Sequence, residues 1–549
     1  MRRTTRRLLL GAAAMLGLGL VDAAAQTGPR DTLVVLREID ADRYDPHRAV
    51  AFAAGEVIFM MTDTLVSMDW DQKTIRPGLA TSWTVSEDGT LYTFKLREDV
   101  TFCDGRKMTA HDVVYSLNRW IDPAIRGPVR WRAGPVKEIR AKDDYTVEYE
   151  LTEPYAELLF QLTLFFAGVV DRHTVERLGD TFGTQGFNGT GPYCWVSWTP
   201  RQELVLQRHP NYSWGPPIYQ NPRPQIERVI WRIIPDPNTR VAALVTGQGD
   251  ITQYIPNFAL ETLRRTPGIT LAQQPNYFVD FFMGFKIDKP VVNDLAIRRA
   301  VNLAVDRDAM VRAVFFGAAD PMRGLIHPAA PGHDPDPRAR TPGYDPAEAR
   351  RILDEAGWRP GPDGIRVKDG QRASFLLYGI TTQTNRQMAE AMQADLRRVG
   401  IDMRVQLFDA TVAWGRLATQ EFDAFFMSYP YVSATDALNL YFRSEAAPTP
   451  NRMNWKDPQT DAWLREARSA LDTAVRQQAV ANVQRQLTEA SVWFPIAHSQ
   501  LWLASGARVA GARPHGVYGS ALYRGLDLRL IPSLSERDSR EGFPDAGGI

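Results

Sequence analysis

A turn, strand, turn and helix pattern in residues 79–119 constrains the fold more than any other stretch of the chain. Asp-Gly dipeptides at positions 88–89 and 104–105 are typical of tight turns. Apolar and polar residues alternate across residues 91–97, which predicts a strand with one buried face. Thr109 precedes an amphipathic run and is expected to cap a helix. The stretch has no catalytic pattern, so we predict that it is structural and that its aromatic side chains lie in a core.

Length and composition indicate a globular chain of more than one domain. The 549 residues exceed what one hydrophobic core supports, and a hydrophobic content of 44% is ordinary for globular proteins. Lysine plus arginine equals aspartate plus glutamate at 64 each. The chain therefore lacks the excess of basic residues that would indicate a nucleic-acid partner. The longest internal apolar run, residues 158–170, is shorter than the roughly 20 residues of a membrane helix and contains Gln161 and Thr163. We expect no membrane insertion.

Residues 1–25 have the form of a secretion signal. Four arginines precede an apolar run at positions 8–20, and the triplet at positions 23–25 is alanine throughout. Cleavage near Ala25 would leave a periplasmic protein, since no cysteine lies there for attachment of a lipid. The arginine pair at positions 6–7 is compatible with export by the Tat route, and the Sec route remains the alternative.

The residues that usually hold metals or perform catalysis show no recognisable spacing. The chain has two cysteines and eight histidines, without a C-x-x-C or H-E-x-x-H motif, and no G-x-S-x-G elbow occurs. We therefore predict no metal, no cofactor and no catalytic residue. In an exported chain, Cys103 and Cys194 either form a disulfide or remain separate thiols.

The second half of the chain alternates strand and helix patterns. Residues 375–378, 401–408 and 422–428 are predicted strands, and helical periodicity separates them. This order implies an α/β region with parallel strand pairs. Ligands of such sheets bind beyond the carboxyl ends of the strands, which here means the loop after Ser428.

Several separated segments resemble those of one known family. They are residues 79–119, the Gly-Thr-Gly-Pro-Tyr motif at 189–193, residues 297–307 and residues 493–498. In this order they resemble the family 5 solute-binding proteins, the receptors that supply peptide and nickel ABC importers. The resemblance covers about residues 32–530. It implies an α/β, two-lobe periplasmic-binding-protein fold of type II, with an enlarged first lobe, mixed sheets and a ligand cleft between the lobes.

The resemblance also implies how the chain divides. We expect a signal peptide at 1–25, a first lobe at 26–270 with an extra subdomain at about 50–185, and a second lobe at 271–492. Residues 493–549 would return to the first lobe and end in a tail. The first crossover between lobes is expected near residues 271–277. The expected partners are a small solute and ABC permease subunits with their ATPases, and we expect a monomer.

Candidate ligand-binding residues come from both lobes. Aromatic side chains with a hydroxyl suit a cleft that closes over a polar solute, and charged groups near strand ends suit its polar parts. The alternative for Trp414 is a place in the core, and for Arg386 a solvated helix position. The second-lobe candidates are Tyr429, Tyr431, Asp436, Trp414 and Arg386, and the first-lobe candidates are Arg37, Tyr44 and Tyr254.

The loop after Ser428 departs from the dipeptide-binding members that it resembles. Those members pair an aspartate with the ammonium group of the ligand, whereas the corresponding position here is Tyr431 or Val432. Asp436 is the available substitute. The departure weakens the case for a free dipeptide and leaves a longer or modified peptide, a sugar-like or opine-like compound, or a metal chelate. We therefore predict a periplasmic ABC-importer receptor and not an enzyme; the alternatives are an exported peptide or amide hydrolase and a ligand sensor on the same fold.

Overall fold

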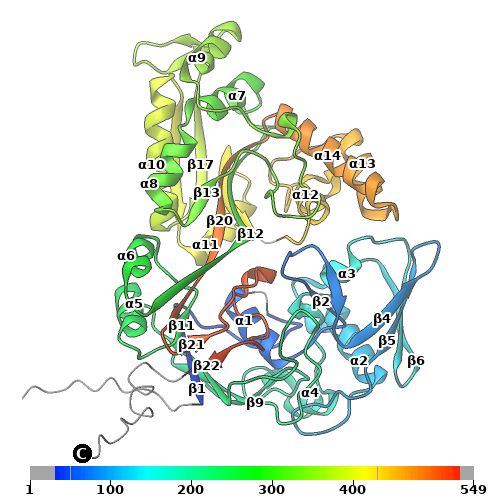
Figure 1. The fold of residues 1–549 in the computed structure, drawn as a ribbon. Coiled ribbons are helices and arrows are strands. Elements are labelled where there is room, and N and C mark those ends of the chain that lie inside the picture. The colour runs from blue at the N-terminus through cyan, green and yellow to red at the C-terminus, as the bar shows by residue number, and fades with distance from the viewer. Residues whose placement is uncertain (1–30, 50, 430, 532–549) are drawn as a thin grey trace, which may run out of the picture.

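The computed structural model describes residues 31–49, 51–429 and 431–531, with side chains throughout except at positions 277–279, 410, 411, 414 and 429. The predicted signal peptide lies outside the described residues. The chain forms two lobes, drawn one above the other in Figure 1, which confirms the predicted fold class. No helix within the described ranges is long and apolar enough to cross a membrane.

One large mixed sheet runs through both lobes. Its two longest strands, β12 and β20, lie antiparallel to each other at its centre, and Figure 1 shows them crossing from one lobe to the other. The strands in spatial order are β18 (Asp402–Phe408), β17 (Ser374–Ile380), β19 (Ala424–Tyr429), β12 (Ile269–Phe285), β20 (Trp493–Gly506), β11 (Ile251–Thr252), β1 (Thr32–Arg37), β10 (Arg228–Ile233), β9 (Glu203–Arg208) and β8 (Tyr193–Thr199), with β13 (Ala319–Pro321) against β20.

The register between β12 and β20 breaks where the chain passes between the lobes. Pairing is regular from Ile269 to Pro275, next to β11 of the first lobe, and resumes at Asp280, next to β19 of the second lobe. A register shift separates the two paired parts. This break overlaps the crossover predicted near residues 271–277.

The first lobe contains a smaller four-stranded antiparallel sheet covered by α2. The alternation predicted for residues 91–97 is confirmed, because Tyr92, Phe94 and Leu96 are buried along one face of β5. The sheet has the order β4 (Ala80–Val85), β5 (Leu91–Leu96), β7 (Thr146–Leu151) and β6 (Val136–Asp143). The lobe's other elements are α1 (Phe52–Met61), α2 (Ala110–Ile121), α3 (Leu158–Gln161), α4 (Arg172–Leu178), α5 (Pro237–Val245), α6 (Leu260–Arg265), β2 (Val66–Met68), β3 (Ile75–Pro77), β21 (Val509–Ala510) and β22 (Arg529–Leu530), with 3-10 turns η1 (Pro123–Ile125), η2 (Arg130–Ala133), η3 (Phe165–Ala167), η4 (Gly179–Thr181), η5 (Asn257–Ala259) and η8 (Val517–Gly519).

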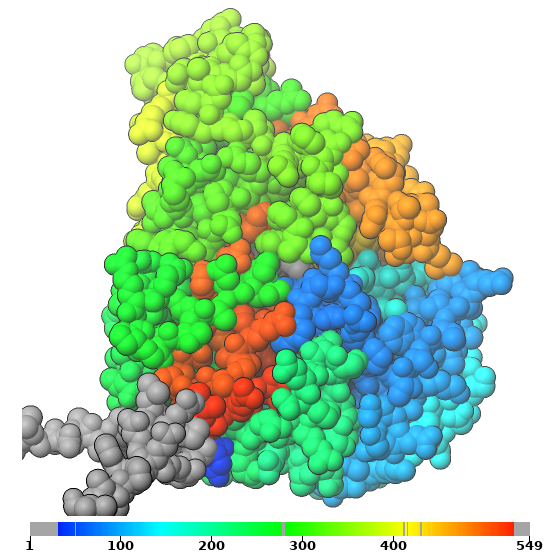
Figure 2. Space-filling model, in the orientation of Figure 1, coloured from blue at the N-terminus to red at the C-terminus, as the bar shows by residue number. Residues whose placement is uncertain are grey.

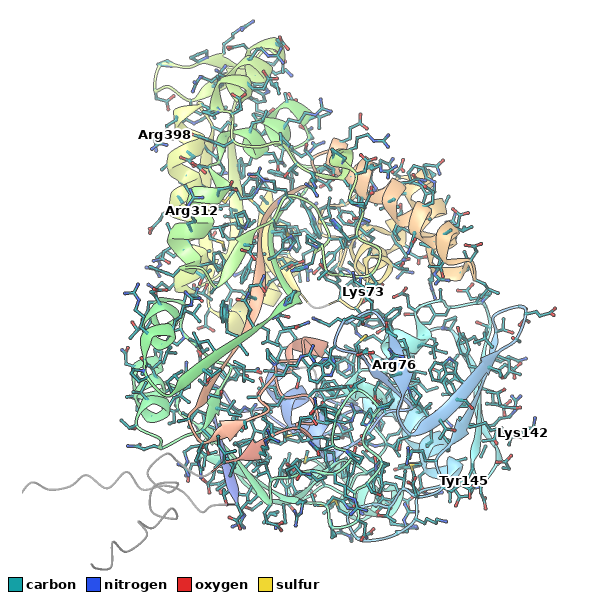
Figure 3. The ribbon with its side chains drawn as sticks, viewed as in Figure 1. Lys73, Arg76, Lys142, Tyr145, Arg312 and Arg398 are labelled. Atoms are coloured by element: carbon teal, nitrogen blue, oxygen red, sulfur yellow. A yellow bond between two sulfur atoms is a disulfide. The ribbon has the colours of Figure 1, made fainter. Side chains whose placement is uncertain are left out.

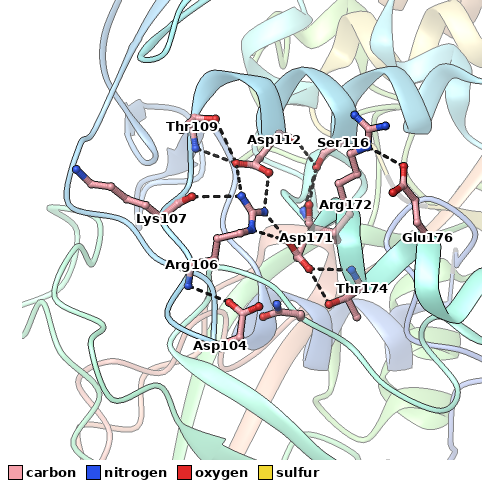
Figure 4. Close-up of polar contacts among 12 residues, drawn as sticks. Asp104, Arg106, Lys107, Thr109, Asp112, Ser116, Asp171, Arg172, Thr174 and Glu176 are labelled. Carbon is pink, nitrogen blue, oxygen red and sulfur yellow. Dashed lines mark hydrogen bonds and ion pairs between the residues drawn. The ribbon is translucent and has the colours of Figure 1, made fainter.

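The predicted cap of α2 belongs to a polar cluster that joins two helices (Figure 4). The Asp112 carboxylate accepts a hydrogen bond from the backbone N–H of Thr109 at 2.9 Å, and Arg106 donates to Asp112 at 2.7 Å and to Asp171 at 3.0 Å. Asp171 in turn caps α4 by accepting from the N–H of Thr174 at 2.8 Å. These hydrogen bonds join the turn that precedes α2 to the start of α4 within the first lobe.

The second lobe confirms the predicted strand and helix alternation. Strand β17 pairs in parallel with both β18 and β19, and helix α10 connects β17 to β18. The lobe contains α7 (Leu295–Ala304), α8 (Arg307–Phe315), α9 (Pro346–Glu355), α10 (Gln383–Arg398), α11 (Ala410–Ala418), α12 (Ala434–Phe442), α13 (Pro458–Ser469), α14 (Thr473–Glu489), β14 (Arg359–Pro360), β15 (Arg366–Lys368), β16 (Gln371–Arg372), η6 (Pro337–Ala339) and η7 (Ser444–Ala446). In Figure 2 the orange atoms of α13 and α14 lie directly above the blue and cyan atoms of the first lobe.

The two cysteines form a disulfide, which decides between the two alternatives left by the sequence. Cys103 lies in the turn that follows β5, and Cys194 lies in β8 of the large sheet. The bond spans a sequence separation of 91 residues. It therefore ties the small sheet's turn to the edge of the large sheet.

Replacing both cysteines, Cys103→Ser with Cys194→Ser, is expected to lower the free energy of unfolding by about 4 kcal/mol, because a long loop is no longer closed in the unfolded chain. Urea midpoints measured with and without a reductant test this. Reduced wild type should match the variant, and the variant should not respond to the reductant. Equal midpoints for oxidised wild type and the variant would contradict the prediction.

Candidate functional site

A cavity of about 800 Å³ lies between the lobes and is lined by both of them. We call it the interlobe pocket. The first lobe contributes Lys73, Glu157 and Phe160, and Figure 3 places Lys73 at the boundary between the lobes. The second lobe contributes the loop at 328–335, the start of α12 and the first half of α14. A volume of this size suits a small organic solute of several functional groups.

Positive charge in the interlobe pocket is only partly neutralised by the protein. Arg485 donates to Asp334 at 2.7 Å, so this pair is balanced. Arg476 donates to the backbone carbonyls of Ala470 and Leu471 at 2.9 and 2.8 Å, and the acid on which its charge acts in this pocket is Glu157, whose raised pKa it opposes. Lys73 is exposed at the pocket's first-lobe edge. The pocket therefore offers cationic groups to a solute that carries a carboxylate.

Glu157 is the first-lobe acid in this pocket, and it contacts the second lobe. Its carboxylate accepts a short hydrogen bond from the hydroxyl of Ser433, which caps α12. Burial raises the pKa of Glu157 to about 7, against the opposing effect of the Ser433 hydrogen bond. The sequence alone does not single out Glu157, because one acid before an apolar helix has no distinguishing pattern.

Asp436, a predicted ligand contact, forms a buried ion pair between the lobes. Its carboxylate accepts hydrogen bonds from Arg132 at 3.1 Å and from Gln161 at 3.3 Å, both of the first lobe, and from the backbone N–H of Val432 at 3.0 Å. The side chains of Arg132 and Asp436 are 4% and 3% exposed. The charge of Asp436 is thus already balanced within the protein, and an ammonium group of a solute would compete with Arg132.

Tyr431, another predicted contact, is buried in a hydrogen-bonded network at the break between β12 and β20. Its hydroxyl donates to Asp280 at 2.5 Å and accepts from the backbone N–H of His327 at 3.0 Å. The other oxygen of Asp280 lies 3.0 Å from Nδ1 of His498. The network joins β12, β20 and the loop after β19, so Tyr431 fixes that loop to the crossing strands.

The same network has the composition of a metal site, but its hydrogen bonds do not suit one. Ligand atoms of Asp280, His327 and His498 lie within 4.8 Å of one another. However, Nδ1 of His327 accepts a hydrogen bond from the backbone N–H of Ala329 at 2.9 Å, and burial lowers its pKa to about 4. A neutral ring that accepts at Nδ1 carries its proton on Nε2, which therefore has no lone pair for a metal. In the other group of this kind among the described residues, the sulfurs belong to the disulfide.

The three first-lobe candidates gather around Glu56, an acid of α1 that the sequence analysis did not select. Tyr254 donates to Glu56 at 2.6 Å, Arg37 lies 3.5 Å from the same carboxylate, and Arg37 donates to Tyr44 at 3.2 Å. Burial raises the pKa of Glu56 to about 7. Arg37 and Tyr44 are fully buried, whereas Tyr254 is half-buried. Of the three, Tyr254 is therefore the one with surface available to a solute. The sequence feature that could have pointed to Glu56 is that it is a lone acid in an otherwise apolar helix.

The remaining candidates are placed by their backbone. Arg386 is exposed in the first turn of α10. Trp414 lies within α11 and Tyr429 ends β19, opposite Asp280, but their side chains are outside the described part of the structure. Their contact with a solute stays a prediction.

A family profile, known protein sequences and solved structures each include matches to this chain. The sequence profile of "Bacterial extracellular solute-binding proteins, family 5 Middle" matches residues 74–448. Protein XP55 of Streptomyces lividans is 32% identical over 507 residues, covering 88% of this chain and 89% of that protein. Glutathione-binding protein GsiB of Escherichia coli (strain K12) is 27% identical, covering 86% of this chain and 89% of its own. The crystal structure of NikA from Brucella suis in complex with Fe(III)-EDTA superposes with a TM-score of 0.78 and 25% identity, over 91% of this chain and 100% of that one.

Removing one partner of the interlobe ion pair is expected to be costly. Arg132→Gln leaves Asp436 buried without its cation, so the free energy of unfolding should fall by about 3 to 5 kcal/mol. Chemical denaturation measures this, and Arg130→Gln, an exposed arginine two positions away, is the matched control. Adding Asp436→Asn to Arg132→Gln should restore part of the loss. Equal effects at positions 130 and 132 would contradict the prediction.

The raised pKa of Glu157 predicts a pH-dependent stability. The folded protein holds the proton up to about pH 7, whereas the unfolded chain releases it near 4.5, so the free energy of unfolding falls as pH rises between these values and is level above them. Glu157→Gln should remove the part of this fall that is due to Glu157, leaving the part due to Glu56, whose pKa is raised in the same way. It should stabilise the protein by about 3 kcal/mol above pH ~8 relative to wild type. Urea titrations across this range test it, with exposed Glu153→Gln as control. An unchanged pH slope in Glu157→Gln would rule the effect out.

Proposed function

Because the chain belongs to the bacterial extracellular solute-binding proteins of family 5, we propose that it captures a peptide or peptide-like solute between its two lobes and delivers it to an ABC permease with its ATPases. The N-terminal secretion signal supports action in the periplasm, with cleavage near Ala25. Binding and closure, and not catalysis, are the proposed mechanism.

The observation that carries this proposal is the interlobe pocket, which neither lobe forms alone. Its walls come from both lobes, and the lobes are connected through paired strands with a register break between them. A solute in the pocket would contact both walls at once, so it would favour their approach. This is the geometry that a receptor needs in order to signal its loaded form to a permease.

The pocket's charges support a solute that carries a carboxylate and several hydrogen-bonding groups. Arg476 and Lys73 would pair with carboxylates, and Ser433 and Thr435 offer hydroxyls. Because Asp436 is already paired with Arg132, a free dipeptide lacks the unpaired aspartate that its ammonium group would need. A modified peptide whose carboxylates dominate recognition, of the kind named for the glutathione-binding relative, fits this arrangement best.

A cognate solute should raise the melting temperature of the mature protein. At a hundredfold excess over Kd, binding to the folded form contributes about 2.7 kcal/mol. A thermal-shift screen with glutathione, di- to tetrapeptides, opines and metal chelates tests this, and native mass spectrometry identifies a solute that co-purifies. No shift across all classes together with no co-purifying molecule would contradict the proposal.

The pocket residues are tested with the solute found in that screen. Lys73→Gln should weaken binding of a carboxylate-bearing solute several-fold, because the exposed amine contributes a modest charge interaction. Arg76→Gln is the matched control, since Arg76 is a nearby exposed cation that pairs with Asp69 and does not line the pocket.

A further inference from the structure

A second and smaller cavity of about 300 Å³ lies at the contact between the lobes. We call it the boundary pocket. The first lobe lines it with Trp131 and Tyr155, and the second lobe with Leu440 of α12 and Pro450, among others. It shares Glu157 and Thr435 with the interlobe pocket but is otherwise lined by different residues. Both lobes thus contribute apolar side chains to its lining.

Trp131 shows that this wall is open to solvent. It is 44% exposed, whereas Tyr155 beside it is 7% exposed. The Arg132 guanidinium lies over one face of the indole, 4.6 Å from its centroid, so the other face is the one that can take a planar or aliphatic group. The boundary pocket therefore has an apolar wall that a small molecule can cover.

Two acids line the boundary pocket, and each already has a partner within the protein. Asp436 is held by Arg132, and Glu157 is bonded to Ser433. The remaining charged residues are Arg443 and Arg468. Their own partners lie at the surface, since Arg443 pairs with Glu445, which is 75% exposed, and Arg468 lies 3.4 Å from Glu153, which is 60% exposed. Exposed pairs of this kind contribute little, so a ligand anion can replace them.

Arg468 places a positive charge next to an aromatic ring, and an amphipathic anion would need both. Its guanidinium lies over the Tyr155 ring, 5.5 Å from the ring centroid. Arg443 and Arg468 also line a neighbouring cavity of about 460 Å³. The boundary pocket thus combines apolar side chains with two arginines that it shares with the next cavity, which suits an amphipathic anion.

We propose that the boundary pocket binds an amphipathic organic carboxylate, with its apolar body against Trp131 and Leu440 and its carboxylate on Arg468 and Arg443. This ligand is distinct from the transported solute. Because its walls belong to both lobes, the occupied pocket stabilises their contact, and by linkage it strengthens solute binding by the same factor by which the solute strengthens carboxylate binding. The site is present whichever solute the interlobe pocket takes.

Calorimetric titration of the mature protein with 4-phenylbutyrate tests the ligand class. We expect one saturable site in the micromolar to millimolar range, binding at least tenfold weaker for the neutral 4-phenylbutyramide, and no binding of the cation 4-phenylbutylamine, since a hydrogen bond to a charged group is worth about a factor of ten or more. Equal binding of acid and amide, or no saturable binding of the acid, would overturn the proposal.

Paired variants test the location. Arg468→Gln should weaken 4-phenylbutyrate at least tenfold, whereas Arg465→Gln, on the same helix and lining only the neighbouring cavity, should leave it unchanged. Leu440→Trp should abolish binding by filling the cavity without removing a charge, which separates loss of the site from loss of the fold. Equal effects at positions 465 and 468, or loss of binding in Lys73→Gln of the interlobe pocket, would overturn the assignment.

Discussion

The pairing of β12 with β20 is the constraint on which the rest of the structure depends. Both strands pass between the lobes, and they are hydrogen-bonded to each other on both sides of the break between Pro275 and Asp280. Two connected strands resist separation and shear, because either motion would leave backbone groups unpaired. Bending at the register break costs far less, since no ladder bonds are lost there. Bending at this break is therefore the relative motion of the lobes that the two strands oppose least.

Asp280 connects this break in the strand pairing to the loop after β19. It resumes the ladder after the break, and its carboxylate holds Tyr431 and His498 at 2.5 and 3.0 Å. The loop after β19 thus moves with the crossing strands, while α12, which follows it, carries Ser433 and Asp436 to their first-lobe partners. Both interactions join the two lobes, so separation of the lobes would break them together. The buried charges gain from each other about what they lose in hydration, so their net effect on the balance between lobe arrangements is small enough for a solute to decide it.

Sequence reasoning succeeded where the cause of structure is local. The burial of Tyr92, Phe94 and Leu96 follows from alternation, and the helix after Thr109 follows from its capping pattern. The position of Tyr431 beyond a strand end was also predictable, although its bond to Asp280 was not. The missed features are pairings over long separations: Asp436 meets Arg132 from 304 residues away, and Glu157 meets Ser433 from 276 residues away. In the sequence, none of these four residues can be told from an ordinary solvent-exposed polar residue. The partners meet only because the fold brings the two lobes into contact.

Glu157 shows how the contact between lobes and the chemistry of the pockets depend on each other. It lines both the interlobe pocket and the boundary pocket, and its pKa is raised by burial, against its hydrogen bond to Ser433. The second lobe contacts this carboxyl group through Ser433, so separation of the lobes would let water reach it and lower its pKa toward the ordinary value. A proton on Glu157 therefore favours contact between the lobes, and the loss of that proton favours their separation. An anion bound in either pocket would raise the pKa of Glu157 further, because a negative charge nearby makes its ionisation harder. It would therefore favour the protonated carboxyl group and contact between the lobes. Charge in either pocket thus affects the contact between the lobes through the protonation of Glu157.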